Sequence, residues 1–343
     1  MTDLREKQII EFLSKNNLGD AKRDKLPSDA SFRTYQRIYN KDKTLILMDA
    51  PSPENEKIGA FANIGNYLRQ RGLSAPEIID YDETGGFMLL EDLGADSFTK
   101  ILAGDNKFSE KELYIAAIET LIQLDRSTLP ANTPPYDEAL LMREVKLLTE
   151  WYLPNIAFSG DRKAATEEYE EIWREILNFK DVSEGVLVLR DYHADNLMWL
   201  SDRNGVQNVG LLDFQDAVIG SPVYDIVSLL EDARRDVKKE TVDACIEYYL
   251  NARKSIDADD FKRVYAILGA QRNCKIVGIF TRLALRDNKP RYLDYLSRVW
   301  GHVNHDLEHP CLAKLKVWMD ECIPQQYRTK DAVQTSNKEY AVG

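Results

Sequence analysis

Two short segments carry oxygen ligands at a spacing that suits phosphate chemistry. Residues 190–196 (RDYHADN) supply Asp191 and, five residues later, Asn196, and the segment LLDFQD supplies Asp213. Phosphoryl transfer from ATP requires an aspartate that accepts a hydroxyl proton, together with an asparagine and a second aspartate that hold Mg²⁺. The sequence therefore predicts a kinase in which Asp191 is the catalytic base and Asn196 and Asp213 are metal ligands.

The residues between these segments predict a β-hairpin. Apolar runs at 197–200 and 209–212 flank Asn204-Gly205, a pair typical of a two-residue turn. With that pair at the centre of the turn, Asn196 lies opposite Asp213, and their Cβ atoms are roughly 5 Å apart, whereas a bulge at 207–208 would break this register. We therefore expect the two side chains to share Mg²⁺.

Neighbouring residues are expected to position this loop. Residues 185–189 (GVLVL) predict a buried strand that delivers the base to the same end of the sheet. His193 could contact phosphate or could orient the loop through a backbone carbonyl group. Asp225 begins a predicted helix, and we expect it to fix the catalytic loop.

The elements that position these residues fall into two predicted lobes. Residues 1–93 predict a small nucleotide-binding α+β lobe, with helices at 3–16 and 54–70 and strands at 32–39, 44–49, 77–82 and 86–91. Residues 94–324 predict a large catalytic and substrate-binding lobe, with helices at 109–126, 137–152, 165–178, 222–236, 240–252, 258–286 and 290–319. Residues 325–343 predict a flexible tail. Such an arrangement favours a nucleotide cleft between the lobes.

Composition limits the kinds of partner. The chain has 343 residues, a net charge of −12 and a pI near 5, which argues against binding to nucleic acid or to an acidic membrane surface. The N-terminal segment has no apolar core, and the four cysteines show no CxxC spacing. We expect a cytoplasmic protein with reduced thiols and no obligate protein partner.

The order of these parts resembles the protein-kinase-like fold and, within it, the aminoglycoside phosphotransferase family. The resemblance covers residues 25–320, and it matches Asp191 and Asn196 to the family's catalytic loop and Asp213-Phe214 to its metal-binding pair. Further segments are similar to the bacterial sugar kinases of cell-wall recycling: PSDASFR (27–33), MDAP (48–51), LEDLG (90–94), YDEALL (136–141) and LDFQDA (212–217). The resemblance implies an α+β two-lobe fold, ATP, Mg²⁺, and phosphorylation of the anomeric hydroxyl of N-acetylmuramate or N-acetylglucosamine.

Departures from the family pattern leave other interpretations open. The strand at 45–49 lacks the lysine that pairs the phosphates in many kinases. Phosphate neutralisation is then expected from Arg33 or Arg37, although either could belong to a solvated strand face. Leu189 and Gln215 replace the usual histidine and glycine without removing a ligand. A pseudokinase-like binding module, or a kinase for an aminoglycoside or a choline-like alcohol, remains an alternative.

Two further segments are candidates for nucleotide binding. One is the segment Ser28, Asp29, Ala30 and Ser31, which can form a tight turn that offers backbone N–H groups to phosphate. Because this segment lacks glycine, a plain hairpin turn is the alternative. The other lies where the lobes are expected to meet, and its backbone could bind adenine or only connect the lobes: Glu91, Asp92 and Leu93.

Candidate sugar-binding residues lie on two predicted helices. Asp137 could cap the helix that follows it, whereas Glu138, Arg143 and Glu144, on other faces of that helix, could reach a hydroxyl or a lactyl carboxylate. Arg272 lies in an otherwise apolar helix, where a charge is costly unless it faces a cavity or an acidic partner. Arg272 is therefore the favoured substrate residue, with a buried ion pair as the alternative.

Overall fold

The structure is a computed structural model, and its chain divides into two compact units. The first unit comprises residues 1–130 and 194–217, and the second comprises residues 131–193 and 218–343. The lobe boundary that the sequence places after residue 93 stays a prediction. The structure describes residues 2–27, 33–41, 43–51, 58–104, 108–177 and 185–334.

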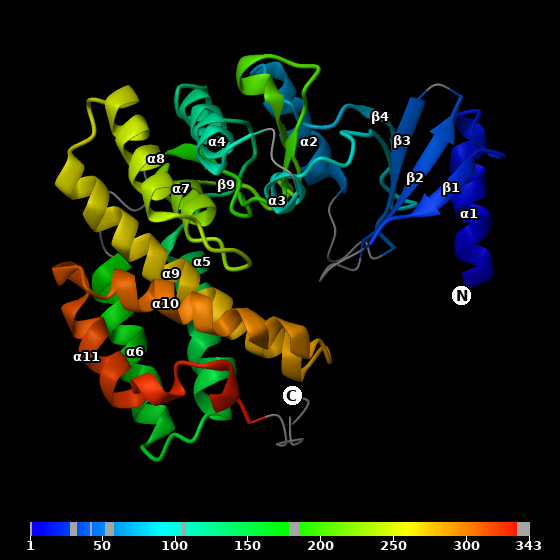
Figure 1. The fold of residues 1–343 in the computed structure, drawn as a ribbon. Coiled ribbons are helices and arrows are strands. Elements are labelled where there is room, and N and C mark those ends of the chain that lie inside the picture. Colours follow the sequence, from blue (N-terminus) through cyan, green and yellow to red (C-terminus); the bar gives the residue numbers. More distant parts are fainter. Residues whose placement is uncertain are drawn as a thin grey trace. The chain divides into compact units, whose positions relative to one another are not determined.

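The first unit is built on a five-stranded antiparallel sheet in the order β1-β2-β3-β5-β4 (Figure 1). The strands are β1 (Lys22–Lys25), β2 (Thr34–Asn40), β3 (Lys43–Asp49), β4 (Ile78–Asp82) and β5 (Phe87–Glu91). The sequence predicts β2 to β5 and misses β1, whose four residues are all charged. Charged residues are tolerated there because β1 is an edge strand and pairs with β2 alone.

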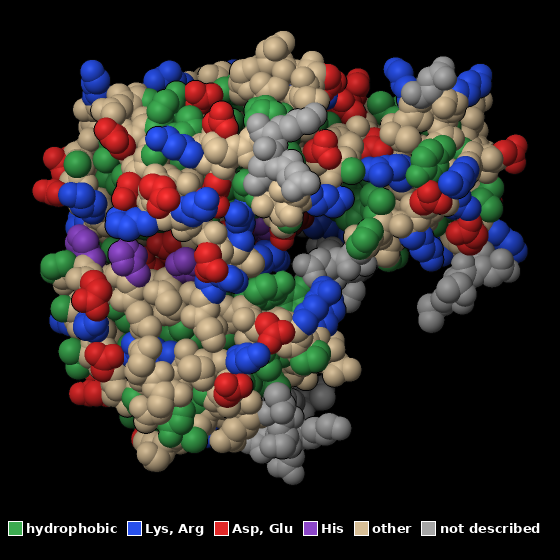
Figure 2. Space-filling view, viewed as in Figure 1, with side chains coloured by type: hydrophobic (Ala, Val, Ile, Leu, Met, Phe, Trp, Pro, Cys, Tyr) green, Lys and Arg blue, Asp and Glu red, His purple; other side chains and the backbone are tan. Residues whose placement is uncertain are grey.

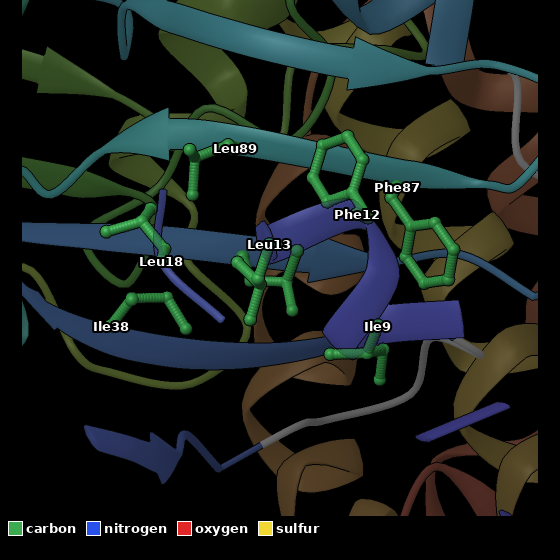
Figure 3. Packing of buried hydrophobic residues seen from close by; sticks show 8 residues of the cluster. Ile9, Phe12, Leu13, Leu18, Ile38, Phe87 and Leu89 are labelled. Atoms are coloured by element: carbon green, nitrogen blue, oxygen red, sulfur yellow. The ribbon is translucent and has the colours of Figure 1, made fainter. Parts of the chain in front are cut away.

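Helix α1 (Thr2–Lys15) packs its apolar side on this sheet. Ile9, Phe12 and Leu13 recur at the spacing of one helical face, which is why the sequence predicts this helix correctly. Figure 3 shows these three side chains against strand residues that include Ile38 and Phe87. The cluster fixes β5, the strand that leads into the segment 91–93.

Three more helices and a small hairpin complete the first unit. They are α2 (Ile58–Gln70), α3 (Phe98–Ala103), α4 (Glu110–Asp125), β7 (Leu197–Trp199) and β8 (Val209–Leu211). The sequence interpretation misses α3, although the side chain of Ser97 caps it by accepting the N–H of Lys100. Phe61 on α2 packs on Phe214 with ring centroids 4.7 Å apart, so the residue after Asp213 is anchored in the core.

The second unit is mostly helical and also contains the short strands β6 (Val186–Val188) and β9 (Val218–Gly220). Its helices are α5 (Glu138–Leu147), α6 (Arg162–Leu177), α7 (Val223–Leu230), α8 (Lys239–Ala252), α9 (Ala258–Leu285), α10 (Leu296–Asp306) and α11 (Ala313–Cys322), with a π-helical turn at Leu148–Tyr152. Long helix α9 packs against α5, α7 and α10 (Figure 1). A side chain at Gly278 of α9 would clash with the backbone of Leu147, since an added Cβ would lie 2.3 Å from its carbonyl carbon.

One prediction for this unit needs correction, whereas the flexible tail predicted at 325–343 stays a prediction. The single helix predicted over 290–319 is divided into a 3-10 turn at Pro290–Tyr295, α10, a second turn at Pro310–Leu312 and α11. Pro310 cannot donate to a continuing helix, which explains the break. Residues 325–334, assigned from sequence to a flexible tail, form short turns in which Arg328 is buried and donates to the side chains of Asn304 and Asp320. The rest of that tail lies outside the described residues.

Charges of both signs are dispersed on the visible surface. Figure 2 shows acidic and basic side chains interspersed on the face drawn there. On that face the negative excess of the chain is therefore distributed rather than gathered in one patch. None of the described helices combines the length and apolar character that crossing a bilayer requires.

Candidate active site

The loop that carries Asp191, the predicted base, follows strand β6 and is called the catalytic loop for this predicted role. This strand pairs antiparallel with β9, a strand that the sequence interpretation did not assign. The prediction that β6 extends the sheet of the metal-binding hairpin is wrong, because β7 and β8 form a separate two-stranded sheet. The loop after β6 is instead positioned by the helix that follows β9.

Helix α7 holds the loop by its backbone. The carboxylate of Asp225 accepts the N–H groups of Leu189 at 2.6 Å and Arg190 at 2.8 Å, and Ser228 Oγ donates to the Arg190 carbonyl at 3.1 Å. These contacts confirm the predicted structural role of Asp225. They also hold Arg190 in the left-handed region (φ 70°), which is strained for a residue with a side chain. The backbone immediately before Asp191 therefore has a fixed and unusual conformation.

A buried carboxylate, Glu144 on α5, fixes the same loop by its side chain. Its Oε1 accepts from the Arg190 guanidinium and from Lys275 Nζ at 3.1 Å. Its Oε2 accepts from the hydroxyl of Tyr136 and from Gln271 Nε2 at 3.1 Å. Burial favours a neutral carboxyl group, but Lys275 and Arg190 outweigh it and lower the pKa of Glu144 to about 2. Glu144 is therefore ionised and joins α5, the catalytic loop and α9. We call Glu144 with these four partners the Glu144 hub.

The sequence interpretation missed this hub, since it placed Glu144 off the buried face of its helix as a possible sugar contact, whereas Glu144 is buried and bonded within the protein. A partial signal exists. Glu144 lies three residues after the buried Leu141 and directly before the buried Val145, at the margin of the apolar stripe. A carboxylate at that place needs buried cations as partners. The predicted helix at 258–286 offers two, because Arg272 and Lys275 lie three residues apart in its apolar part.

Positive groups surround Asp191 within the second unit. Burial raises the pKa of its carboxyl group, while Lys275, Arg190 and Arg272 lower it, and the net result lies below the ordinary value. Asp191 is therefore a carboxylate at neutral pH and has an acceptor available for a proton. This state agrees with the role predicted for it.

His193 is buried and lies close to an arginine. Its Nε2 is 3.2 Å from the guanidinium nitrogen NH1 of Arg234. A guanidinium only donates hydrogen bonds, so Nε2 accepts and the neutral ring carries its proton on Nδ1. Burial is the main cause that lowers the pKa of His193. A neutral His193 can position the loop, and its predicted contact with substrate stays a prediction.

The register of the metal-binding hairpin differs from the predicted one. Strands β7 and β8 pair so that Asn196 lies opposite Leu212, whose N–H donates to the Asn196 carbonyl at 3.0 Å. The predicted pairing of Asn196 with Asp213 is wrong by one residue. The cause is the connection, which contains a 3-10 helix at Gly205–Asn208 instead of a two-residue turn.

Asp213 nevertheless keeps an oxygen suited to a metal ion. Its Oδ1 accepts from Arg33 and from Gln215 Nε2, each at 3.0 Å. Its Oδ2 accepts no hydrogen bond from the residues that the structure describes, and the side chain is 40% exposed. Asp213 has a left-handed backbone (φ 59°), so strand alternation does not decide where its carboxylate points. Carboxylate and amide oxygens suit Mg²⁺, which needs few protein ligands.

The two arginines predicted to neutralise phosphate have different partners. Arg33 is buried and bonded to Asp213. Arg37 donates to Asp92 at 2.6 and 3.0 Å and to the Gly94 carbonyl at 2.9 Å. Arg37 therefore stabilises the segment after β5, and Arg33 is the arginine beside the candidate metal ligand.

The segment predicted to bind adenine has its side chains engaged within the first unit. Glu91 accepts from the guanidinium of Arg203 and from the N–H of Glu77 at 3.1 Å, while Asp92 accepts from Arg37. Leu93 packs in an apolar cluster with Met198, Leu200 and the half-buried Leu212. Any nucleotide contact here would use the backbone. The other nucleotide candidates, Ser28, Asp29, Ala30 and Ser31, lie outside the described residues.

The candidate sugar residues fall into an exposed and a buried group. Asp137 is the N-cap of α5, since its Oδ1 accepts the N–H of Leu140 at 2.9 Å, which confirms the capping interpretation. Asp137, Glu138 and Arg143 are exposed, whereas Arg272 is 5% exposed. The structure brings Arg272 into the electrostatic surroundings of Asp191.

Sequence comparisons place the chain among enzymes that transfer phosphate. The sequence model of the phosphotransferase enzyme family matches residues 23–265. An N-acetylmuramate/N-acetylglucosamine kinase from Caulobacter vibrioides is 36% identical, over 94% of this chain and 98% of its own. A kinase of the same name from Pseudomonas putida is 35% identical, over 84% of each chain.

Solved structures show a similar fold. A choline kinase from Streptococcus pneumoniae has a TM-score of 0.62 at 13% identity, and the similarity covers 89% of this chain and 99% of that one. An ADP-bound aminoglycoside phosphotransferase has a TM-score of 0.60 at 14% identity, over 94% and 98% of the two chains. These similarities confirm the predicted kinase-like α+β fold. The match of the family model over residues 23–265 and the 36% identity to the Caulobacter vibrioides kinase establish that the chain belongs to the phosphotransferase enzyme family.

Proposed function

We propose that this protein is an ATP-dependent kinase that phosphorylates the anomeric hydroxyl of N-acetylmuramate or N-acetylglucosamine in cell-wall recycling. The observation that carries the proposal is the similarity to the Caulobacter vibrioides kinase over nearly the full length of both chains. The presence of Asp191, Asn196 and Asp213 supports catalysis rather than binding alone, because a binding module needs no base. We place the activity in the cytoplasm, where ATP is available.

Asp191 is the proposed base. Its carboxylate is ionised, and the backbone before it is held by Asp225. The sugar hydroxyl would donate its proton to Asp191 as the bond to phosphorus forms. An anomeric hydroxyl is more acidic than an ordinary alcohol, so a weak carboxylate base suffices.

Asn196 and Asp213 are the proposed metal ligands. Oδ2 of Asp213 and the amide oxygen of Asn196 would hold Mg²⁺, which when bound would neutralise charge on the phosphates of ATP. Arg33 is the proposed substitute for the missing strand lysine, because its guanidinium lies beside Asp213. The backbone of residues 28–31 and 91–93 is the proposed contact for the rest of the nucleotide.

Five residues remain proposed contacts for the sugar, with unequal support. Arg272 and His193 are buried in the unit that contains the base, and both influence its charge. Asp137 already uses its carboxylate as a helix cap, and Glu138 and Arg143 are exposed on the same helix. Arg272 therefore has the strongest case.

A panel of sugars tests the proposal. We expect ADP release with N-acetylmuramate or N-acetylglucosamine and Mg-ATP, and none with their methyl glycosides, which lack a free anomeric hydroxyl. The phosphorus NMR signal of the product should show coupling to the proton on C1. Asp191→Asn is the control for contaminating kinase activity. Turnover with aminoglycosides or choline alone, or phosphate on C6, would overturn the proposal.

A further inference from the structure

Arg272 lies in the middle of α9, where that helix packs against α5, α7 and α10 (Figure 1). Its neighbours in sequence are fully buried and have partners: Gln271 donates to Glu144 at 3.1 Å, and Asn273 Nδ2 donates to Glu231 at 2.6 Å. Arg272 is 5% exposed. Within the described part of the chain it makes no hydrogen bond and no ion pair, and its guanidinium nitrogen NH1 is completely buried.

A buried guanidinium without partners is unfavourable for the fold. It carries five N–H donors, and each donor removed from water without a replacement acceptor lowers stability. Three buried carboxyl groups respond to the charge of Arg272: Asp191, Asp225 and Glu231. Burial has the largest effect and raises the pKa of each, whereas Arg272 is among the groups that lower these pKa values. These carboxylates offset part of the cost of the buried charge, but none of them accepts its hydrogen bonds.

The geometry of the guanidinium suggests which ligand would accept the hydrogen bonds of Arg272. A guanidinium binds a carboxylate through two parallel hydrogen bonds, which a neutral hydroxyl cannot reproduce. The two sugars of the proposed function differ in this respect, because N-acetylmuramate carries a lactyl carboxylate and N-acetylglucosamine does not. Asp191, the proposed base, lies within the electrostatic reach of Arg272.

We propose that Arg272 binds the lactyl carboxylate of N-acetylmuramate and thereby sets a preference for this sugar acid over neutral N-acetylglucosamine. The inference rests on the proposed function, and it adds the residue that distinguishes the two substrates. It accounts for a buried arginine whose donors find no acceptor among the residues that the structure describes.

Steady-state kinetics with both sugars test this assignment. Arg272→Met keeps a long side chain but removes its charge and its hydrogen-bond donors. Arg272→Lys keeps the charge but cannot form the two parallel hydrogen bonds of a guanidinium. We expect KM for N-acetylmuramate to rise roughly 10- to 100-fold in Arg272→Met, and less in Arg272→Lys. KM for N-acetylglucosamine and for ATP should change by less than about 3-fold. Arg263→Met, on the same helix but paired with Asp260 at 3.0 Å, is the matched control and should leave both sugars unaffected.

A second measurement needs only the unaltered protein, in case the variants fail to fold. The methyl ester of N-acetylmuramate removes the negative charge from the substrate and should raise KM by a similar factor, roughly 10- to 100-fold. Where Arg272→Met folds, it should no longer distinguish the acid from the ester.

The outcomes separate this inference from the proposed function. Equal loss with both sugars would make Arg272 a positioning residue for Asp191, and a rise in KM for ATP would assign it to the phosphates. Either result, or an ester that matches the acid in the unaltered protein, overturns the inference alone. Failure to phosphorylate either sugar overturns the proposed function and this inference with it.

Discussion

The carboxylate of Asp225 on α7 accepts the backbone N–H of Arg190 at 2.8 Å, one residue before the proposed base. The same carboxylate also accepts the N–H of Leu189, so one side chain fixes two successive peptide groups. Burial raises the pKa of Asp225 to about 7, although both N–H donors favour its ionised form. The conformation of the catalytic loop therefore depends on a carboxyl group of α7, outside the loop itself.

Replacing Asp225 with Asn should misplace the loop. The amide would present N–H donors to at least one backbone N–H, and a buried hydrogen bond would be lost. We expect kcat to fall roughly 10-fold or more and the free energy of unfolding to fall by about 1–3 kcal/mol, with KM for ATP unchanged. Steady-state kinetics and chemical denaturation measure these effects. Asp243→Asn, which removes an exposed pair with Lys239, is the control. Unchanged kcat and stability in Asp225→Asn would contradict the assigned role.

Replacing Asp191 with Asn tests the base directly. The variant keeps the shape of the side chain but cannot accept the hydroxyl proton, so turnover should fall by roughly 10² to 10⁴ while ATP binding survives. ADP-release assays and nucleotide titration measure the two properties. Asp195→Asn, an exposed position in the following segment, controls for a general loss of negative charge. If Asp191→Asn keeps more than half of the activity, another group is the base.

The metal assignment predicts unequal effects at the two proposed ligands. Asp213→Ala should abolish the Mg²⁺-dependent part of nucleotide affinity, because it removes the only charged ligand proposed for the ion. Asn196→Ala should weaken that part without abolishing it, since an amide oxygen is neutral. Calorimetric titration of nucleotide with and without Mg²⁺ measures the difference, and Asp216→Ala serves as the control. Equal Mg²⁺ dependence in the unaltered protein and in Asp213→Ala would remove the metal from this hairpin.

The two arginines of the first unit should respond differently to the same substitution. Arg33→Gln should raise KM for ATP roughly 10-fold, because a charge beside the phosphates is lost, and Arg33→Lys should restore part of the affinity. Arg37→Gln should instead lower the melting temperature, since it leaves the carboxylate of Asp92 buried without its cation. Kinetics and thermal unfolding of both variants test this contrast. A larger KM effect in Arg37→Gln would reverse the assignment.

Spacing along the chain was enough to find the residues proposed for chemistry, because the catalytic and metal segments are short and local. Spacing could not fix the hairpin register. The pairing of Asn196 depends on whether the connection closes through two residues or through the 3-10 helix at Gly205–Asn208, and Asn204-Gly205 is compatible with both. A single residue of difference in that connection changed the partner of Asn196 from Asp213 to Leu212.

The Glu144 hub was beyond sequence reasoning for a different reason. Its donors are Tyr136, Arg190, and Gln271 and Lys275 of α9, which lie on three segments of the chain and up to 131 residues away in sequence. The local pattern marks Glu144 only as a residue at the margin of the apolar stripe and does not show which donors meet at it. The cap at Asp137, by contrast, depends only on the next three residues and was predicted correctly.

A buried pair of carboxyl groups, one at the C-cap of α7 and one on α10, should make stability depend on pH. Asn273 Nδ2 donates to Glu231 at 2.6 Å and to Asp306 at 3.3 Å, and both acids are buried. Burial raises the pKa of Glu231 from its ordinary 4.5 to about 7. Between these two values the unfolded chain releases a proton that the folded chain keeps, so this group lowers stability as pH rises through that window.

Glu231→Gln should remove this dependence, because an amide does not titrate and can donate to Asp306. We expect the melting temperature of the variant, relative to the unaltered protein, to rise by roughly a few degrees between pH 5 and pH 8. Calorimetry at several pH values measures the difference. Glu240→Gln, at an exposed position of α8, is the control and should follow the unaltered protein at every pH. Parallel curves for Glu231→Gln and the unaltered protein would mean that Glu231 is already ionised throughout this range.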